Sequence, residues 1–200
     1  MTEEVIQGDY DEPEPPKGKK FVYICFSNVA RMEGKVPWEN KAAAAATGND
    51  RTHVEIMFWS LNKTFTVTRR TKIVKALDKQ VRPFYDVFRI EVSEAEYVAI
   101  MDYLNLQVGK EYDDEEFFCF IPSVFIYSLT CQLWAPCVSD DKITCTRLVG
   151  GALKSAGIAN EYSDRDVYYM TCTDIERIIK NRNPVLLKGI ITASSNVGYY

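Results

Sequence analysis

Four stretches of the chain carry hydrophobic patterns that are typical of β-strands. Residues 21–26 form an unbroken apolar run, and residues 52–59 alternate between apolar and polar positions. A turn predicted at residues 61–63 joins the second stretch to residues 64–68, so these two strands should form an antiparallel hairpin. Residues 84–92, rich in aromatic and β-branched side chains, are the fourth strand. The first half of the chain therefore predicts an antiparallel sheet.

Three later segments carry the start signals and spacing of helices. Ser93 opens a capping box with the glutamate three residues on, before apolar residues at helical spacing. Thr144 is a good N-cap for a second helix, which repeats apolar residues every three or four positions and stops at Gly157. A further capping box, Thr173 with Glu176, begins a helix that runs to about residue 180.

Other segments leave alternatives open. Residues 27–50 hold the alanine tract 42–46, which is either a short helix or part of a long loop over a cleft. Residues 115–133 are dense in aromatic and aliphatic side chains and predict core, as helix or strand. Residues 166–170 predict an edge strand or a loop. The glycine pair at 150–151 inside a helix suggests that another backbone packs closely there, with a sheet as the natural neighbour.

Composition indicates one globular unit with two extensions. A chain of 200 residues that is 46% hydrophobic and 26% charged can fill a single core. Residues 1–20, acidic and containing three prolines, predict a flexible arm, and residues 184–200 predict a C-terminal extension or arm. The predicted fold class is α+β, with the domain spanning residues 21–183.

Cys145 is the candidate nucleophile of this domain. It follows the N-cap Thr144 and so lies in the first turn of the predicted helix. Unpaired backbone N–H groups and the positive end of the helix dipole favour an anion there, so the pKa of the thiol should fall. The sequence therefore predicts a reactive thiolate at Cys145.

His53 is the candidate base, because the chain contains a single histidine. It lies near the start of the predicted strand 52–59, with Glu55 and Met57 on its face and Val54, Ile56 and Phe58 on the other. A histidine at the start of a strand that faces a helix N-terminus can deprotonate a thiol and later protonate a leaving group.

Four short motifs, in this chain order, resemble a known family. They are THVEIMF, QVGKEYD, ITCTRLVGGALKSAGI and TDIERII. Together they resemble the circularly permuted papain-like proteins. These include NlpC-type and YiiX-like thiol hydrolases, relatives of lecithin:retinol acyltransferase, and members encoded by poxviruses and other large DNA viruses. Papain-like enzymes normally place the cysteine first, whereas in the permuted branch, as here, the histidine leads.

The resemblance implies a fold, an activity and a site. The fold is an antiparallel sheet packed against a helix that begins at the nucleophilic cysteine. The activity is acyl chemistry at Cys145, with His53 shuttling the proton. In the relatives a polar residue, often a glutamate, orients the imidazole from the next strand. Here that stretch is TVT at residues 66–68, which makes Thr68 the positional match, and Glu55 on the strand of His53 is the other candidate.

Several classes of function receive no support from the sequence. The net charge is −4 without a dense basic cluster, so we expect no nucleic-acid partner. The chain has no apolar run of roughly 18 to 20 residues and no signal-like N-terminus, so we expect no transmembrane segment and an intracellular, cytoplasmic and reducing location. Its six cysteines form no C-x-x-C pair, so we expect no metal and no cofactor.

Two functions of different classes remain. The first is a thiol hydrolase, such as a thiol protease, or an acyltransferase, which acts on a peptide, an isopeptide or a lipid ester. The second is a catalytically inert papain-like protein that serves as a structural or interaction component, for example in a virion. In that role the two terminal arms would bind other structural proteins.

Overall fold

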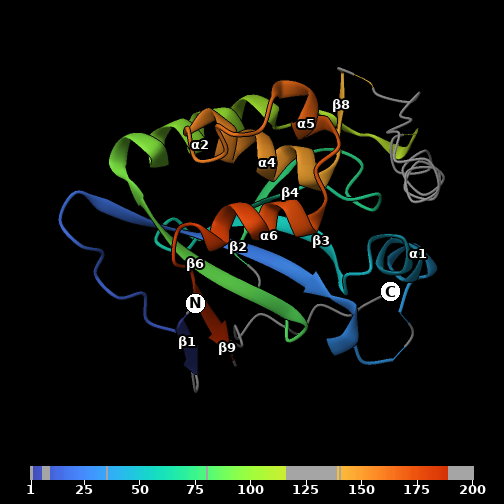
Figure 1. Cartoon of the computed structure of the whole chain (residues 1–200), viewed down its shortest axis with the longest axis horizontal. Coiled ribbons are helices and arrows are strands. Elements are labelled where there is room, and N and C mark those ends of the chain that lie inside the picture. Colours follow the sequence, from blue (N-terminus) through green and yellow to red (C-terminus); the bar gives the residue numbers. More distant parts are fainter. Residues whose placement is uncertain are drawn as a thin grey trace.

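A seven-stranded sheet in the order β1-β9-β6-β2-β3-β4-β5 forms the framework (Figure 1). The computed structural model describes residues 2–5, 10–34, 36–79, 81–115, 139 and 141–188. Neighbouring strands of the sheet are antiparallel, apart from the parallel pair β1 and β9. The strands are β1 (Thr2–Val5), β2 (Lys19–Asn28), β3 (Arg51–Phe58), β4 (Lys63–Thr66), β5 (Lys75–Asp78), β6 (Tyr85–Ser93) and β9 (Val185–Lys188).

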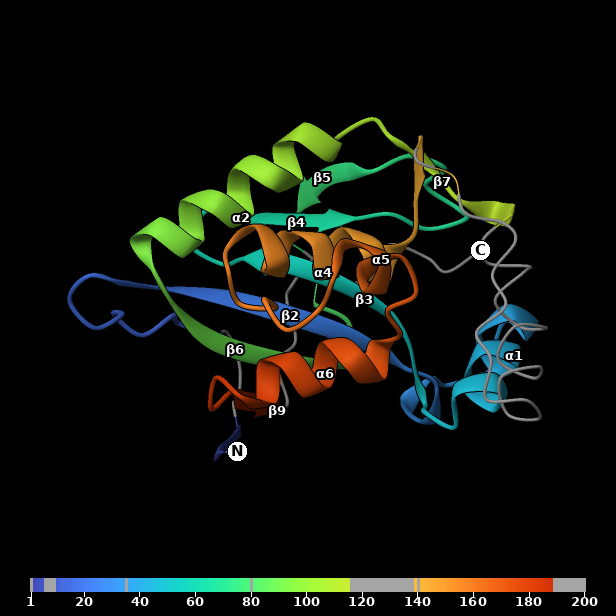
Figure 2. The same ribbon diagram turned by 45° about the horizontal axis from the view of Figure 1, so that its top comes forward.

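Three helices, α2, α4 and α6, pack on one face of this sheet (Figures 1 and 2). A short parallel pair of strands, β7 (Glu111–Tyr112) and β8 (Lys142–Ile143), leads into α4. The predicted α+β class with an antiparallel sheet is confirmed. The helices are η1 (Val29–Arg31), α1 (Trp38–Thr47), α2 (Glu94–Gln107), α4 (Cys145–Ser155), α5 (Asp164–Tyr168) and α6 (Cys172–Lys180).

Both faces of the sheet are buried. The face under the helices carries alternate residues of the central strands, among them Val22, Ile24, Phe26, Val54, Ile56, Phe58, Phe88 and Ile90. The opposite face carries the intervening positions and forms a second cluster, with Tyr10, Phe21, Tyr23, Cys25, Met57, Val81, Tyr85, Val87 and Leu187. The alternation predicted for residues 52–59 therefore places Val54 and Glu55 on different faces, as expected for a strand.

Part of the predicted N-terminal arm packs on the second face. The Tyr10 hydroxyl lies 3.2 Å from that of Tyr23, and Arg89 donates to it at 2.7 Å. Tyr23 also donates to Glu12 at 2.9 Å. The predicted C-terminal extension contributes β9, which lies between β1 and β6. Residues 189–200, most of the stretch 115–133, and the cysteines at 119, 131 and 137 lie outside the described residues.

Two local expectations were wrong: the edge strand or loop at residues 166–170, and the start of the following helix at Thr173. In both places an earlier Ser or Thr caps the helix. Residues 166–170 belong largely to α5, where Ser163 caps the helix through a capping box with Asp166. The box that opens α6 is Thr171 with Asp174, two residues earlier than predicted. The Thr173 hydroxyl accepts a hydrogen bond from Asn49 at 2.9 Å and ties α6 to the residues before β3. The alanine tract, for which a helix and a loop were both open, lies in helix α1.

The glycine pair of α4 packs closely against side chains, not against a sheet backbone. A Cβ atom on Gly151 would overlap the ring of Tyr103 from α2, and one on Gly150 would overlap the sulfur of Met170. The expectation of a close sheet backbone was therefore wrong. What the glycines provide is room for an aromatic ring against the α4 backbone, which brings α2 and α4 close together.

Replacing Gly151 with alanine should lower the free energy of unfolding by about 1 to 3 kcal/mol, since overpacking outweighs the gain in helix propensity. Urea denaturation measures the loss. The control is Gly151→Ala combined with Tyr103→Ala, in which the added methyl no longer meets a ring and should cost nothing further. A single Gly151→Ala variant as stable as the wild type would contradict this packing.

Candidate active site

Helix α4 presents Cys145 at its first position. Thr144 stands at the N-cap with extended backbone (φ −93°, ψ 168°), and its carbonyl accepts the first helical hydrogen bond from Leu148 at 2.9 Å. The apolar face of α4, including Leu148, Val149 and Ala152, is fully buried in the first core cluster. Because this face is fixed against β3 and α2, the first turn and its cysteine are held in place.

Strand β3 presents His53 near its start, at an irregular point of the sheet. The register with β2 shifts between Ser27, which faces His53, and Asn28, which faces Arg51. The Arg51 guanidinium donates to buried Asp86 at 2.9 Å and to Glu176 of α6 at 2.6 Å. These ion pairs tie the start of β3 to β6 and α6, so they fix the backbone that carries His53.

The Cys145 thiol and the His53 imidazole lie close enough to shift each other's pKa by charge and hydrogen bonding. The sulfur also accepts from the backbone N–H groups of Val54 and Thr146. Strand β4 pairs with β3 at Ile56 to Phe58, and the cysteine approaches the preceding part of the same strand. The N-terminus of α4 thus meets β3 beside the place where the hairpin pairing ends.

This contact favours movement of the proton from sulfur to nitrogen. Burial alone would lower the pKa of His53, but the Cys145 thiolate and the Glu55 carboxylate outweigh it and raise the pKa to about 10. Burial alone would raise the pKa of Cys145. The positive charge of His53 and the two N–H donors more than reverse this and hold the pKa below its ordinary value. Both shifts favour the ion pair of a thiolate with an imidazolium over the neutral pair.

Two side chains face the Nε2 nitrogen of His53. His53 Nε2 lies 3.2 Å from Thr66 Oγ1 and 3.6 Å from Glu55 Oε2. The Glu55 side chain is only 8% exposed, so its attraction to the imidazolium is weakly screened. The long glutamate reaches back along its own strand to orient the ring.

Thr68, the positional match for an orienting group, lies in the turn that follows β4. Its hydroxyl accepts from the backbone N–H of Thr71 at 3.0 Å. The structure thus brings Cys145, His53 and Glu55 together, whereas Thr66 takes the place expected of Thr68. The pairing of the hairpin strands could have identified Thr66 as the neighbour of the histidine. Because Ile56 pairs with Phe65, the next pair of opposite positions is Glu55 and Thr66.

A second cysteine lies close to the pair. Cys172 is the first residue of α6 and is buried in the first core cluster, against which Cys145 packs. Burial, reinforced by the negative charge of Cys145, raises the pKa of Cys172 well above its ordinary range. Burial and the charge of Glu55 do the same for Cys25. These two thiols are therefore expected to stay protonated and unreactive.

A buried arginine holds the segment that precedes the cysteine. The Arg147 guanidinium donates to the Ser139 carbonyl at 3.0 Å and lies 3.7 Å from the carboxylate of Asp113. It also stacks over the ring of Tyr168, 4.1 Å from the centroid. Arg147 thereby connects Ser139, which precedes α4, to Asp113, which follows β7, and to Tyr168 of α5.

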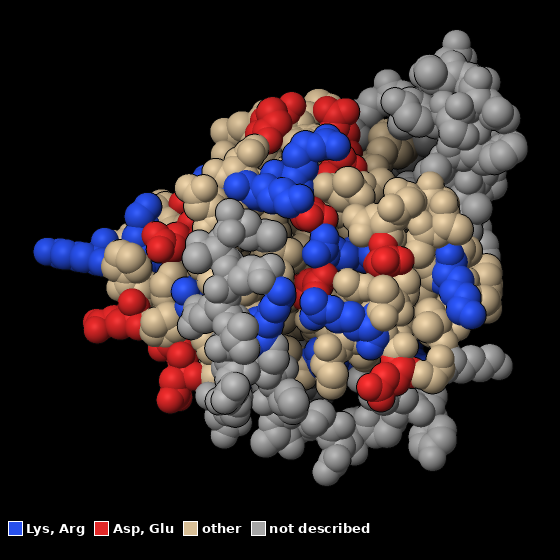
Figure 3. Space-filling view, turned by 60° about the horizontal axis from the view of Figure 1, so that its bottom comes forward, with Lys and Arg blue, Asp and Glu red and all other residues tan. Residues whose placement is uncertain are grey.

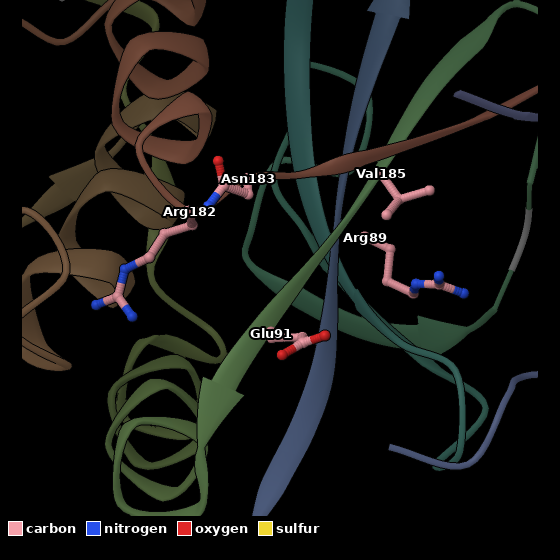
Figure 4. Close-up of a pocket in the computed structure, with 5 residues that line it drawn as sticks. All are labelled: Arg89, Glu91, Arg182, Asn183 and Val185. Carbon is pink, nitrogen blue, oxygen red and sulfur yellow. The ribbon is translucent and has the colours of Figure 1, made fainter. Parts of the chain in front are cut away.

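A separate pocket of about 300 Å³ lies against β6 and β9 (Figure 4). Its lining residues are Arg89, Glu91, Arg182, Asn183 and Val185. The two arginine side chains point in opposite directions (Figure 4), and Arg182 pairs with Glu96 at 2.7 Å. The pocket therefore presents no convergent binding groups, and none of the residues around Cys145 lines it.

Further features bear on binding. Among the described residues, no group of three or more His, Cys, Asp and Glu side chains is arranged to hold a metal ion. Within the same part of the chain, no helix combines the length and the apolar character that a bilayer crossing requires. The face drawn in Figure 3 mixes Lys and Arg with Asp and Glu. Comparison with protein-family models, with curated proteins and with solved structures gave no match.

The thiol of Cys145 should react with iodoacetamide well below the free-thiol pKa of about 8.5, because the positive charge of His53 and the N–H donors favour the thiolate. Rates against pH, followed by peptide mass spectrometry, check this, with buried Cys25 and Cys172 as internal controls. In His53→Ala the profile should return to that of an ordinary thiol. An ordinary profile in the wild type, or one that survives the substitution, would argue against the ion pair.

Removing Asp86 should destabilise the fold by about 3 kcal/mol, because the substitution removes the buried carboxylate that pairs with Arg51 and Arg31 and leaves Arg51 with Glu176 alone. The matched control is Arg31→Ala. Arg31 also binds Asp86, at 3.0 Å, but its side chain is 40% exposed, so its loss should cost less than about 1 kcal/mol. Urea denaturation of Asp86→Ala and Arg31→Ala compares them. Equal losses would show that Asp86 does not anchor β3.

Proposed function

We infer that this chain is a cysteine hydrolase or acyltransferase that uses Cys145 as nucleophile and His53 as base and acid. The observation that carries the inference is the placement of Cys145, the first residue of α4, beside His53 of β3, where the two groups shift each other's pKa toward a thiolate–imidazolium pair. An ionised thiol is the form of cysteine that attacks a carbonyl carbon. A thiol that served packing alone would be better buried in its neutral form, as Cys25 and Cys172 are.

The reaction follows from the positions of the groups. The Cys145 sulfur attacks the carbonyl carbon of the substrate, and the carbonyl oxygen becomes an oxyanion. The backbone N–H of Cys145, in the first turn of α4, is the nearest donor for that charge. His53 then donates its proton to the departing amine or alkoxide, which leaves an acyl group on the sulfur. Finally, His53 deprotonates water or an acceptor hydroxyl or amine, and this attacks the acyl group and frees the thiol.

The chain order and the architecture support a permuted papain-like fold. The histidine strand precedes the cysteine helix in the chain, the sheet is largely antiparallel, and α4 packs on it with the nucleophile at its first residue. These features agree with the resemblance of the four sequence motifs. The substrates of that class are peptides, isopeptides and lipid esters, and we propose one of these amides or esters for this chain.

The location in a reducing compartment is part of the proposal. Cys25, Cys145 and Cys172 are all free thiols. A catalytic thiolate close to a second thiol survives best where disulfides are kept reduced. This supports an intracellular place of action, and a virion role belongs to the inert alternative.

Incubation with a reactive acyl ester should acylate Cys145, and mass spectrometry of the intact and digested protein detects the added acyl group. Cys145→Ala should abolish the label and the turnover. His53→Ala should lower turnover by about 10²-fold or more, since general acid–base catalysis is lost. Cys172→Ala is the matched control, because it removes the other thiol at the first position of a helix and should leave the label on Cys145.

Turnover that survives His53→Ala would remove His53 from the mechanism. If Cys145 accepts no acyl group from esters, thioesters or activated amides, the chain is not an acyl-transferring enzyme. The inert structural or interaction protein would then be the better description, and the terminal segments would be the place to look for its partners.

A further inference from the structure

Polar side chains form a buried row across three strands on the second face of the sheet. Ser27 of β2 faces His53 of β3 on one side and Tyr85 of β6 on the other. Two residues along β2, Cys25 faces Glu55. Exposed fractions are 4% for Ser27, 6% for Glu55 and 8% for Tyr85. This row continues directly from the active-site histidine into an otherwise apolar cluster of tyrosine, valine and methionine side chains.

The buried carboxylate in this row needs partners on two sides. A carboxylate removed from water costs free energy unless charges or hydrogen-bond donors surround it. On one side of Glu55 lies His53 Nε2, at 3.6 Å. On the other, Tyr85 lies across β2 on the same face of the sheet, close enough for its hydroxyl to interact with the carboxylate. Cys25, directly opposite Glu55, is buried and stays neutral. Arg82, whose charge also acts on Tyr85, is the further charged group on this side.

Tyr85 can act only as a donor to Glu55. Burial, together with the negative charge of Glu55, raises the pKa of Tyr85 well above its ordinary range, so the phenol keeps its proton. A neutral phenol that donates to one carboxylate oxygen fixes the rotation of the carboxylate about its last bond. The other oxygen is then directed to His53. Glu55 alone, on the flexible end of a long side chain, would not be fixed in this way.

We propose that Tyr85 is a positioning residue of the active site, which holds Glu55 against His53 and thereby stabilises the imidazolium that keeps Cys145 ionised. The proposal rests on the proposed function, because it assumes the thiolate–imidazolium pair. It extends the site from α4 and β3 to β6, as a chain of four residues that runs Tyr85, Glu55, His53, Cys145. The tyrosine lies across β2 from the reacting groups and touches no substrate.

The test is the pH dependence of Cys145 alkylation by iodoacetamide in the full chain, in the wild type, Tyr85→Phe, Glu55→Gln and the double variant. Tyr85→Phe should shift the acid limb of the profile to higher pH, with about threefold to tenfold less thiolate on that limb. The reason is that a less firmly held carboxylate stabilises the imidazolium less. In the Glu55→Gln background, the same substitution should change the profile no further, because its only route to the histidine is gone.

The matched control is Tyr23→Phe. Tyr23 is a buried tyrosine on the same face, but its hydroxyl bonds to Tyr10 and Glu12. Tyr23→Phe therefore removes an equivalent buried hydroxyl without touching Glu55, and its profile should match that of the wild type.

Each outcome separates the two ideas. A low-pH wild-type profile that Tyr85→Phe leaves unchanged overturns the role of Tyr85 but keeps the proposed function. Equal shifts in Tyr85→Phe and Tyr23→Phe, or additive shifts in the double variant, also overturn it, since they indicate general loosening of the sheet. An ordinary wild-type profile overturns the ion pair and the role of Tyr85 together.

Discussion

The contact between the Cys145 thiol and the His53 imidazole is the interaction on which the other features of the site depend. It requires the first turn of α4 to lie beside β3, and each flanking contact serves that placement. Val54 and Thr146 donate to the sulfur, Thr66 and Glu55 face the histidine, and the Arg51 ion pairs anchor the strand. The buried face of α4 supplies the position of the helix. Hydrophobic packing thus sets the location, and polar contacts set the charge state.

The signals that place Cys145 and His53 on their elements are local in the sequence. An N-cap followed by a cysteine, and a histidine in an alternating strand, place each group on its own element without any knowledge of the rest of the fold. Because the chain contains a single histidine, only His53 could be proposed as the base for Cys145. The same locality explains the misplaced cap of α6, since the segment TCTDIE contains two overlapping capping patterns. The hydroxyl of Thr173 is engaged by Asn49, a residue far away in the sequence.

What could not be predicted depends on pairing between distant segments. Tyr103 fills the space beside Gly151 from a different helix, so nothing near the glycines identifies it. Thr66 required the register of the hairpin, and Tyr85 required two registers across β2. The place of β9 between β1 and β6 joins the two ends of the chain. In each case the deciding contact is set by strand order, which hydrophobic periodicity does not encode.

The ion pair also shapes how the site contributes to stability. Because the pKa of His53 is raised to about 10, its contribution to stability is fully present below its unfolded pKa of about 6.5 and is lost as pH rises toward about 10. Because the pKa of Cys145 is lowered, its contribution is present above its unfolded pKa of about 8.5 and is lost as pH falls through the lowered value. The two shifts arise from the same contact, so the charge separation proposed for catalysis and the stability of the fold depend on pH together.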